Sequence, residues 1–255
     1  MRISLVIPCY NEKENLPTLV KNLQNLIERK KLDAEIILVD DNSADSTHDI
    51  CNMFERKYDN IFAIHRIGNR GMGGALLDGT KEARGNVVIW VMADLSDDLN
   101  TIPKFLKKIK NGYDVVFGSR YMKGGSSGDL SFFKTAASRG FTILSRIFIG
   151  IRVHDITNAF RAFRKDVIES IDLKSNDYAI SPEFALKAHL AKFKLAEVPT
   201  VYSNRKRGIT KFKMFKMSIR YFSVFLSLFF QELIERFHER FTNILYPSLL
   251  MENKK

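Results

Sequence analysis

The sequence predicts an α/β protein whose mostly parallel sheet is covered by helices on both faces. Short apolar runs alternate with segments of helical spacing across residues 2–119. Each of these helical segments is long enough to carry the chain back across a sheet, which favours parallel pairing of the strands. The chain has 255 residues, of which 45% are hydrophobic, enough for one large domain or two small ones.

The first half of the chain contains five expected strands and four expected helices. The strands are the apolar segments at residues 2–8, 34–39, 61–65, 87–92 and 114–119. The helices are the segments with a 3.6-residue apolar period at residues 15–29, 46–57, 74–83 and 101–110. Pro103 falls in the first turn of the last of these helices, where its missing N–H costs nothing.

The pattern changes after residue 121. An unusually apolar helix is expected at 132–151 and a short strand at 159–163. A helix at 182–191 is expected to start with Ser181 as its N-cap, and a strand follows at 195–202. We find no internal repeat and no linker, so residues 1–212 are expected to form one domain that includes interfacial helices at about 131–151. Residues 213–255 are expected to form a C-terminal amphipathic, membrane-associated helix and tail.

The net charge of +11 favours anionic partners such as phosphates, nucleic acid or an acidic membrane face. Residues 198–231 contain no acidic side chain, whereas residues 205–220 contain seven cations. The next eleven residues, 221–231, carry no charge, which is fewer than the ~20 apolar residues of a membrane span. This arrangement predicts a peripheral helix that lies on a membrane surface, with Phe225, Leu226 and Phe229 as contacts. The alternatives are a helix packed on the core and a dimer contact.

The cysteines and histidines point to no metal site. Cys9 and Cys51 form neither a disulfide framework nor a zinc-ligand pattern, which favours a reducing compartment. Because the chain opens directly into a strand, no signal peptide is expected, and we expect the protein on the cytoplasmic face of a membrane. The five histidines show no ligand spacing and are assigned no catalytic role: His48, His65, His154, His189 and His238.

An acidic cluster follows the fourth expected strand. Asp94, Asp97 and Asp98 come directly after the apolar run 87–92. Carboxylates at a buried strand tip are costly unless a cation compensates them, so a divalent cation with an anionic ligand is a natural partner. A solvated, Asp-rich turn would give the same local pattern.

Two further strand tips carry polar side chains, and ligands of open parallel sheets bind at such tips. The first expected strand leads into Tyr10 and Glu12, and the second leads into Asp41. A stacking aromatic ring, carboxylates that accept from a base or ribose, and a metal carboxylate at Asp94 together suit a nucleotide diphosphate. A nicotinamide-binding fold is disfavoured, because its glycine-rich loop would follow the first strand. Here the glycines of segment 71–74 follow the third strand, where they permit a close backbone approach to a ligand or a neighbouring strand.

Several motifs, in order and at fitting spacing from about residue 2 to 211, resemble family 2 glycosyltransferases. More narrowly, they resemble the subgroup of dolichol-phosphate mannose synthases and polyprenyl-phosphate glycosyltransferases. The motifs are Ile7-Pro-Cys-Tyr-Asn-Glu-Lys-Glu-Asn-Leu16, Val39-Asp-Asp-Asn-Ser-Ala-Asp-Ser-Thr47, Gly118-Ser-Arg-Tyr121, Asp155-Ile-Thr-Asn-Ala-Phe-Arg161, Glu197-Val-Pro199 and Arg205-Lys-Arg-Gly-Ile-Thr-Lys211.

The resemblance implies a GT-A fold and an inverting transfer of mannose or glucose from a nucleotide diphosphate sugar to a polyprenyl or dolichyl monophosphate. It also implies a set of site residues. Asp94 and Arg120 are implied as catalytic, and Asp94 and Asp97 as ligands of Mg²⁺ or Mn²⁺. The implied acceptor-phosphate residues are Lys134, Ser138 and Arg139. The implied donor-binding residues are Pro8, Tyr10, Glu12, Val39, Asp41, Met92, Ala93, Arg205 and Lys211.

Two positions depart from the family pattern. Met92 stands where the family commonly has a first aspartate, and a thioether does not replace a carboxylate on a hard cation. Asp97 is the expected substitute. Lys134 stands where arginine is usual, which gives up bidentate phosphate binding.

A lipid phosphate is already anionic, so this reaction needs no dedicated base. It needs cations that hold two anions together. The rival hypotheses are a family 2 transferase with a saccharide acceptor, a non-catalytic nucleotide-sugar-binding protein, and a basic nucleic-acid-binding module. The acidic strand tips disfavour the last of these, since they would repel a phosphate backbone. The sequence leaves the donor sugar, its base and the oligomeric state open.

Overall fold

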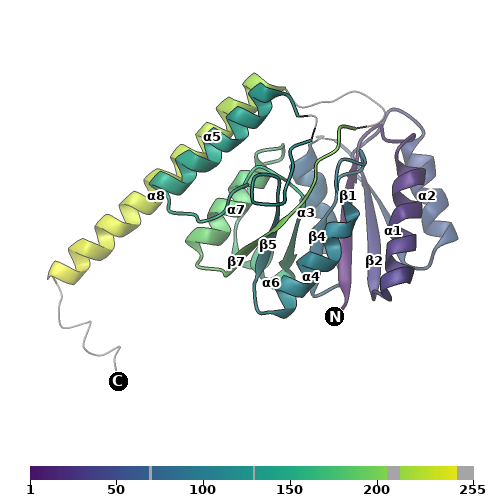
Figure 1. Cartoon of the computed structure of the whole chain (residues 1–255), viewed down its shortest axis with the longest axis horizontal. Coiled ribbons are helices and arrows are strands. Elements are labelled where there is room, and N and C mark those ends of the chain that lie inside the picture. The colour runs from purple at the N-terminus through teal and green to yellow at the C-terminus, as the bar shows by residue number, and fades with distance from the viewer. Residues whose placement is uncertain (69–70, 129, 206–212, 246–255) are drawn as a thin grey trace.

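The computed structural model describes residues 1–68, 71–128, 130–205 and 213–245. In this part of the chain a seven-stranded sheet has the order β3-β2-β1-β4-β6-β5-β7 (Figure 1). The strands are β1 (Ile3–Cys9), β2 (Ala34–Asp40), β3 (Ile61–His65), β4 (Val87–Trp90), β5 (Val115–Ser119), β6 (Arg161–Arg164) and β7 (Leu195–Pro199).

The sheet is mostly parallel, as the sequence predicts. β1 pairs in parallel with β2 and β4, β2 with β3, and β5 with β7. Only β6 runs in the opposite direction, between β4 and β5. The carboxyl ends of the parallel strands therefore meet at one edge, which is where the polar strand tips lie.

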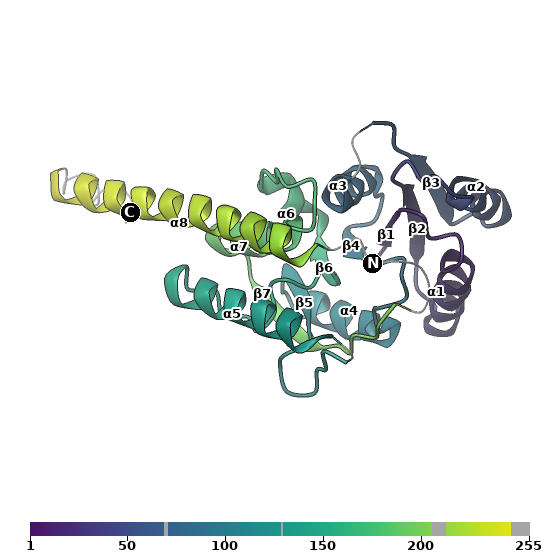
Figure 2. The same cartoon turned by 90° about the horizontal axis from the view of Figure 1, so that it is seen from above.

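The described helices cover both faces of the sheet (Figure 2). On one face, α1, α2 and α4 pack against alternate residues of β1 such as Leu5 and Ile7. On the other face, α3, α6, α7 and the first half of α8 pack around Val6, Trp90 and Phe184. The helices are α1 (Leu16–Lys30), α2 (Thr47–Lys57), α3 (Met72–Glu82), α4 (Ile102–Lys110), α5 (Phe132–Phe148), α6 (Lys165–Ser170), α7 (Ile180–Leu190) and α8 (Met214–Leu245), with a 3₁₀ turn at Leu99–Thr101.

Several element ends differ from the sequence-based expectation; β4 ends at Trp90, β6 begins at Arg161 and α3 begins at Met72. Three other differences have a clear local cause. α7 begins at Ile180, so Ser181 is inside the helix and is not its N-cap. Just before the helix, the Asp177 side chain accepts a hydrogen bond from the Ala179 N–H at 2.9 Å. Pro182 lies in the first turn, where its missing N–H has no partner to lose. α5 ends at Phe148 because Gly150 adopts a φ of +86° and leaves the helix. β7 ends at Pro199, and Tyr202 forms only an isolated bridge with Asp97.

The guanidinium of Arg161, at the start of β6, is wholly buried and supports the loop that precedes it. It donates to the carbonyl oxygens of Ser181 at 2.9 Å and Ala159 at 3.2 Å, and it stacks over three aromatic rings. The rings are those of Trp90, Phe117 and Phe184, at 5.5, 5.1 and 5.1 Å. Burial lowers the pKa of Arg161 to about 9.

Helix α8 is partly core and partly exposed. The expectation that Phe225 contacts a membrane is wrong: it is 4% exposed in the core beside α5 and α7, and Leu226 and Phe229 pack against the same cluster. Helix α8 is apolar around much of its circumference, so periodicity did not show which face is buried. The stretch Met214–Glu235 is, by length and composition, long and apolar enough to cross a bilayer, which the uncharged segment 221–231 alone is not.

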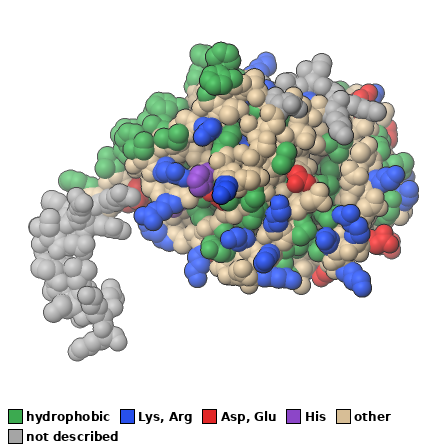
Figure 3. Space-filling model, in the orientation of Figure 1, with side chains coloured by type: hydrophobic (Ala, Val, Ile, Leu, Met, Phe, Trp, Pro, Cys, Tyr) green, Lys and Arg blue, Asp and Glu red, His purple; other side chains and the backbone are tan. Residues whose placement is uncertain are grey.

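The exposed apolar side chains of α5 and α8 form a ridge that projects from the sheet domain, visible as the green band at the upper left (Figure 3). We call this surface the α5/α8 ridge. Its members are Phe132, Phe133, Ile143, Ile147, Phe148, Met214, Phe215, Ile219, Phe222, Phe230, Leu233, Ile234 and Phe237. The gathering of so many exposed apolar side chains on two neighbouring helices marks it as an interaction surface.

Candidate active site

Two adjoining cavities open at the edge of the sheet where the parallel strands end. The smaller, about 270 Å³, is lined by strand tips and is called here the donor cavity. The larger, about 470 Å³, extends below α5 and α8 and is called the acceptor cavity. Five residues line both: Met72, Met92, Asp94, Tyr178 and Arg205.

The donor cavity collects most of the residues that the sequence analysis assigned to donor binding. Pro8, Tyr10 and Glu12 follow β1, and Asp41 follows β2. The members of the acidic segment, Met92, Ala93 and Asp94, complete the wall together with Arg205. Val39 is different, because its side chain is buried in the core and lines neither cavity. Lys211 lies outside the described residues.

The Asp41 carboxylate, which lines this cavity, is bound by two other groups of the protein. One of its oxygens forms an ion pair with Arg66, and the other accepts from the Gly71 N–H at 2.6 Å. Arg66 also binds Asp78 at 2.8 Å, so Asp41 is tied to α3. Arg66 was not predicted from the sequence, because β3 brings it beside Asp41 only in the folded sheet.

The glycines of segment 71–74 permit a close backbone approach, as expected, but mainly to the segment before α7. The Gly73 N–H donates to the Asn176 carbonyl at 3.0 Å, and a Cβ at Gly71 would lie 2.0 Å from that same oxygen. Because no side chain fits there, this segment can press against Asn176 and leave Gly71 at the cavity wall.

Glu12 forms an ion pair with Arg205 across 193 positions of sequence. Asn15 donates to the other oxygen of Glu12 at 2.6 Å, and the Glu12 N–H donates to Thr47. The pair brings the segment after β7 onto the tip of β1. Arg205 is thereby placed between the two cavities, where it can face an anion in either.

The acidic segment after β4 places Asp94 in both cavities and Asp97 in the acceptor cavity. Asp97 accepts from the Met92 N–H at 2.8 Å, so Met92 contributes a backbone contact where the family has a carboxylate. Burial raises the pKa of Asp97 to about 8, with a further contribution from the charge of Asp94. A pocket that disfavours a second negative charge suits a bound cation, and two carboxylates offer the oxygen ligands that Mg²⁺ and Mn²⁺ take. The residues therefore fit the expected metal, for which Asp94 and Asp97 would be the protein ligands.

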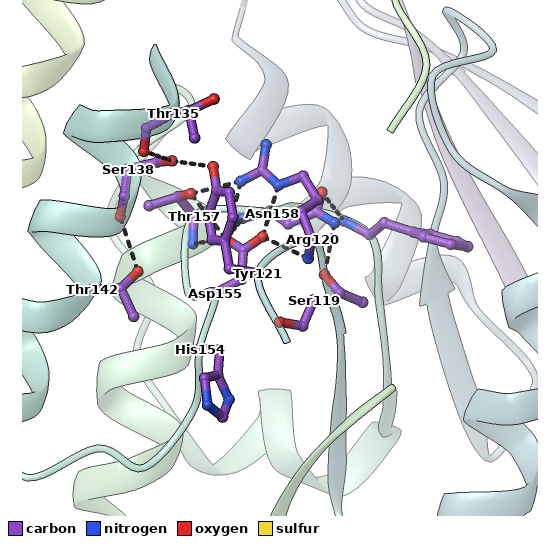
Figure 4. Close-up of polar contacts among 12 residues, drawn as sticks. Ser119, Arg120, Tyr121, Thr135, Ser138, Thr142, His154, Asp155, Thr157 and Asn158 are labelled. Carbon is purple, nitrogen blue, oxygen red and sulfur yellow. Dashed lines mark hydrogen bonds and ion pairs between the residues drawn. The ribbon is translucent and has the colours of Figure 1, made fainter. Parts of the chain in front are cut away.

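Arg120 follows β5 and reaches the acceptor cavity from a buried ion pair (Figure 4). Its guanidinium binds the fully buried Asp155 at 2.7 and 3.0 Å and donates to Thr157 at 2.8 Å. Although burial by itself would lower the pKa of Arg120, the charge of Asp155 raises it above the ordinary value. Arg120 is thus a fixed cation, held in one orientation by a carboxylate 35 residues away.

Helix α5 supplies the opposite wall of the acceptor cavity. Lys134 and Ser138 line it, and the Ser138 hydroxyl hydrogen-bonds Tyr121 (Figure 4). Arg139 is exposed and lies over the Tyr121 ring at 5.6 Å, so it supports this wall from outside. Apolar side chains fill the rest of the wall, among them Ala137, Phe141, Leu144, Met214 and Phe222.

Glu183 is a structural residue. It is buried, and its two oxygens accept from the N–H groups of Lys174 and Ser175 at 2.9 and 2.8 Å. Burial would raise its pKa, but the hydrogen bonds from Lys187 and Ser175 outweigh burial and lower it. It lines neither cavity.

The chain matches known proteins in sequence. A family model described as "Glycosyl transferase family 2" matches residues 4–172. A dolichol-phosphate mannosyltransferase of Pyrococcus furiosus is 36% identical over 215 residues, which are 84% of this chain and 60% of that protein. A polyprenol monophosphomannose synthase of Mycolicibacterium smegmatis is 31% identical over 217 residues, covering 82% of this chain and 80% of that protein. The chain thus spans less than two thirds of the Pyrococcus relative.

Solved structures support the fold. A glucosyl-3-phosphoglycerate synthase from Mycobacterium tuberculosis, in complex with Mg²⁺ and UDP, matches with a TM-score of 0.67 at 15% identity, over 89% of this chain and 79% of that one. The same enzyme with Mn²⁺, UDP and phosphoglyceric acid matches with a TM-score of 0.65 at 15% identity, over 89% of this chain and 78% of that one. The GT-A fold expected from the motifs is confirmed. The chain belongs to glycosyl transferase family 2.

Proposed function

We propose that this protein transfers a hexose from a nucleotide diphosphate sugar to a polyprenyl monophosphate at a membrane surface, with inversion at the anomeric carbon. The main support for this proposal is the pair of adjoining cavities that share Asp94 and Arg205. One cavity has the strand-tip side chains that suit a nucleotide, and the other is apolar with cations at its inner end. The names of the two curated relatives support the same substrates.

The donor cavity would hold the nucleotide diphosphate through Tyr10, Glu12 and Asp41 near β1 and β2. Its diphosphate would lie toward Asp94 and Arg205, where the two cavities meet. A divalent cation on Asp94 and Asp97 would supply charge neutralisation for the departing diphosphate.

The acceptor cavity would hold the lipid phosphate between Arg120, Lys134 and Arg205. These cations offset the repulsion between two anionic reactants, and Asp155 keeps Arg120 in place. An acceptor phosphate oxygen forms a bond to the anomeric carbon as the bond from that carbon to the diphosphate breaks. The bonding pair leaves with the nucleotide diphosphate, so no proton has to be removed from the nucleophile.

The apolar wall of the acceptor cavity continues into the α5/α8 ridge, because both are built from the same two helices. A lipid chain could therefore run from the cavity along the ridge into a bilayer. We place the protein at the cytoplasmic face of a membrane, where nucleotide sugars and a reducing environment occur together.

A second candidate is transfer to a saccharide hydroxyl. The observation in its favour is Asp97, a carboxyl group in the acceptor cavity whose raised pKa of about 8 suits a general base. The apolar wall and the cations of that cavity favour the lipid phosphate.

The full chain, incubated in liposomes with GDP-mannose or UDP-glucose, a divalent cation and polyprenyl monophosphate, tests the proposal. We expect a lipid-linked hexose phosphate detected by mass spectrometry with one of the donors, and at least a ~100-fold loss with Asp94→Asn. Product only with hydroxyl acceptors would establish the second candidate. Donor binding without any product would show a non-catalytic binding protein.

A further inference from the structure

A cluster of side chains that could ligate a metal ion lies outside both cavities, next in sequence to Asp41 of the donor cavity. Asp40 ends β2, His48 is in the first turn of α2, and His65 ends β3, next to β2 (Figure 2). One potential ligand atom from each of the three lies within 4.8 Å of the others. The histidines are far apart in sequence, which is why their spacing predicts no site.

The distances within this cluster suit a shared cation. Oδ2 of Asp40 lies 3.4 Å from Nδ1 of His48 and 3.3 Å from Nδ1 of His65. Ligands bonded to Zn²⁺ at 2.0–2.1 Å in a tetrahedron are separated by about 3.3–3.4 Å. A direct charge-assisted hydrogen bond would be shorter, at about 2.7–2.9 Å. Both Nδ1 atoms lie near the same Asp40 oxygen. The two rings are stacked with their centroids 3.7 Å apart, so one ring would have to turn for both nitrogens to bind a single ion.

Hydrogen bonds to the cluster resemble those that orient the ligands of a metal site. Nε2 of His65 lies 2.8 Å from Oδ1 of Asn52, the contact that a metal-bound imidazole makes through its other nitrogen. When Nε2 donates to Asn52, Nδ1 of a neutral ring presents a lone pair to the Asp40 oxygen. Two acceptors then face each other unless a cation, either a second ring proton or a metal ion, lies between them. The other Asp40 oxygen accepts from the Ser43 N–H at 3.1 Å, which fixes the carboxylate.

We propose that Asp40, His48 and His65 form a binding site for a transition-metal dication, with Zn²⁺ as the best-fitting ion. Two imidazoles and one carboxylate favour such an ion over Mg²⁺, which takes oxygen ligands. Asp40 is 3% exposed at its side chain, whereas His65 is 26% and His48 is 50% exposed. The site is therefore anchored in the sheet and open on one side, where water can complete the tetrahedron.

A metal ion at this site would restrain the wall of the donor cavity, because Asp40 is next to Asp41 in the chain. Asp40 is followed directly by Asp41, whose carboxylate holds Arg66 and the Gly71 N–H. An ion that joins β2, α2 and β3 would restrain the backbone of Asp41 and stabilise the native chain by mass action. The site would thus act as a structural clamp on the donor wall.

Zn²⁺ titration of the metal-free full chain, with a competing chromophoric chelator, tests this site. We expect one bound equivalent that survives in Asp94→Ala and is not displaced by millimolar Mg²⁺. Affinity should fall ~100-fold or more in His48→Ala and His65→Ala, and ~10–100-fold in Asn52→Ala. His154→Ala is the matched control, because His154 is equally exposed and has a carboxylate partner, Glu197 at 2.7 Å, without a second histidine. Unchanged Zn²⁺ affinity in both cluster variants, or its loss in Asp94→Ala, would overturn the proposal.

A measurement on the unsubstituted protein covers the case in which a cluster variant does not fold. Cu²⁺ bound in place of Zn²⁺ should show electron paramagnetic resonance couplings to two imidazole nitrogens. A spectrum without nitrogen couplings would equally overturn the proposal.

Discussion

The donor and acceptor cavities adjoin, yet they are built in different ways. The donor cavity is lined by the loops that leave β1, β2 and β4, and two of its carboxylates, Glu12 and Asp41, are already paired with arginines. The acceptor cavity is enclosed by α5 and α8, which contribute apolar side chains and Lys134. The parallel sheet therefore preorganises the donor side, whereas the acceptor side depends on helices that come from distant parts of the chain.

The largest expected effect is on the buried ion pair between Asp155 and Arg120, which supports the acceptor side. Asp155→Ala leaves the Arg120 guanidinium, 10% exposed, without its carboxylate. Removing one partner of a buried pair typically costs about 3–5 kcal/mol. We expect the free energy of unfolding, measured by urea denaturation, to fall by that amount, together with most of the transferase activity. The control is Asp172→Ala, which removes an exposed pair with Lys174 and should leave both quantities unchanged. An Asp155→Ala protein of full stability would show that the acceptor side does not depend on this pair.

The next effect concerns the α5/α8 ridge. Replacing Phe132, Phe133 and Phe215, which are 79%, 72% and 81% exposed, by serine removes apolar area from its surface. Partial burial of three phenylalanines in a membrane is worth about 3 kcal/mol, so liposome binding should weaken about a hundredfold by co-sedimentation. Met53→Ser on α2, an exposed apolar side chain away from the ridge, is the control. Equal co-sedimentation of the triple variant and the unsubstituted protein would separate the ridge from membrane binding.

A smaller effect should separate acceptor binding from donor binding. Lys134→Ala removes a cation from the acceptor cavity, so the KM for the lipid phosphate should rise roughly tenfold, while the KM for the nucleotide sugar stays constant. Lys134→Arg should retain or improve lipid affinity, because a guanidinium can bind phosphate through two bonds. The exposed Lys123 offers a control, Lys123→Ala, that changes net charge equally. A parallel change in both KM values would place Lys134 at the shared wall instead.

The smallest effect is a pH dependence at Asp97. Its pKa of about 8 means that the folded chain holds a proton that the unfolded chain loses above about pH 4. The free energy of unfolding therefore falls as pH rises through this window. In metal-free protein at pH 8.5, Asp97→Asn should raise Tm, and the difference should shrink toward zero as the pH is lowered to 4. Asp59→Asn, at an exposed site, should behave like the unsubstituted protein at both pH values. A Tm difference that is the same at both pH values would exclude titration of Asp97 as its cause.

The sequence predicted the donor side better than the acceptor side for a physical reason. Donor residues follow strands directly, so the alternation of strands and helices is enough to bring Tyr10, Asp41 and Asp94 to one edge. The partners Arg66 and Asp155 were not predicted, because the sheet pairs them with Asp41 and Arg120 across long separations. Burial of Phe225 was missed for a related reason: an apolar helix has several possible buried faces, and only its packing on α5 and α7 selects one.

The reversed direction of β6 determines how this fold can diversify. Because β6 enters the sheet from the same edge at which β4 and β5 end, the loop that carries Asp155 and Thr157 reaches the acceptor cavity before the strand begins to pair. Arg161 then fixes the strand start against Trp90 and Phe117. Insertions upstream of Arg161 can therefore lengthen or reshape the loop without shifting strand register. Homologous enzymes could exchange one acceptor for another by this route while the parallel strands keep the donor cavity in place.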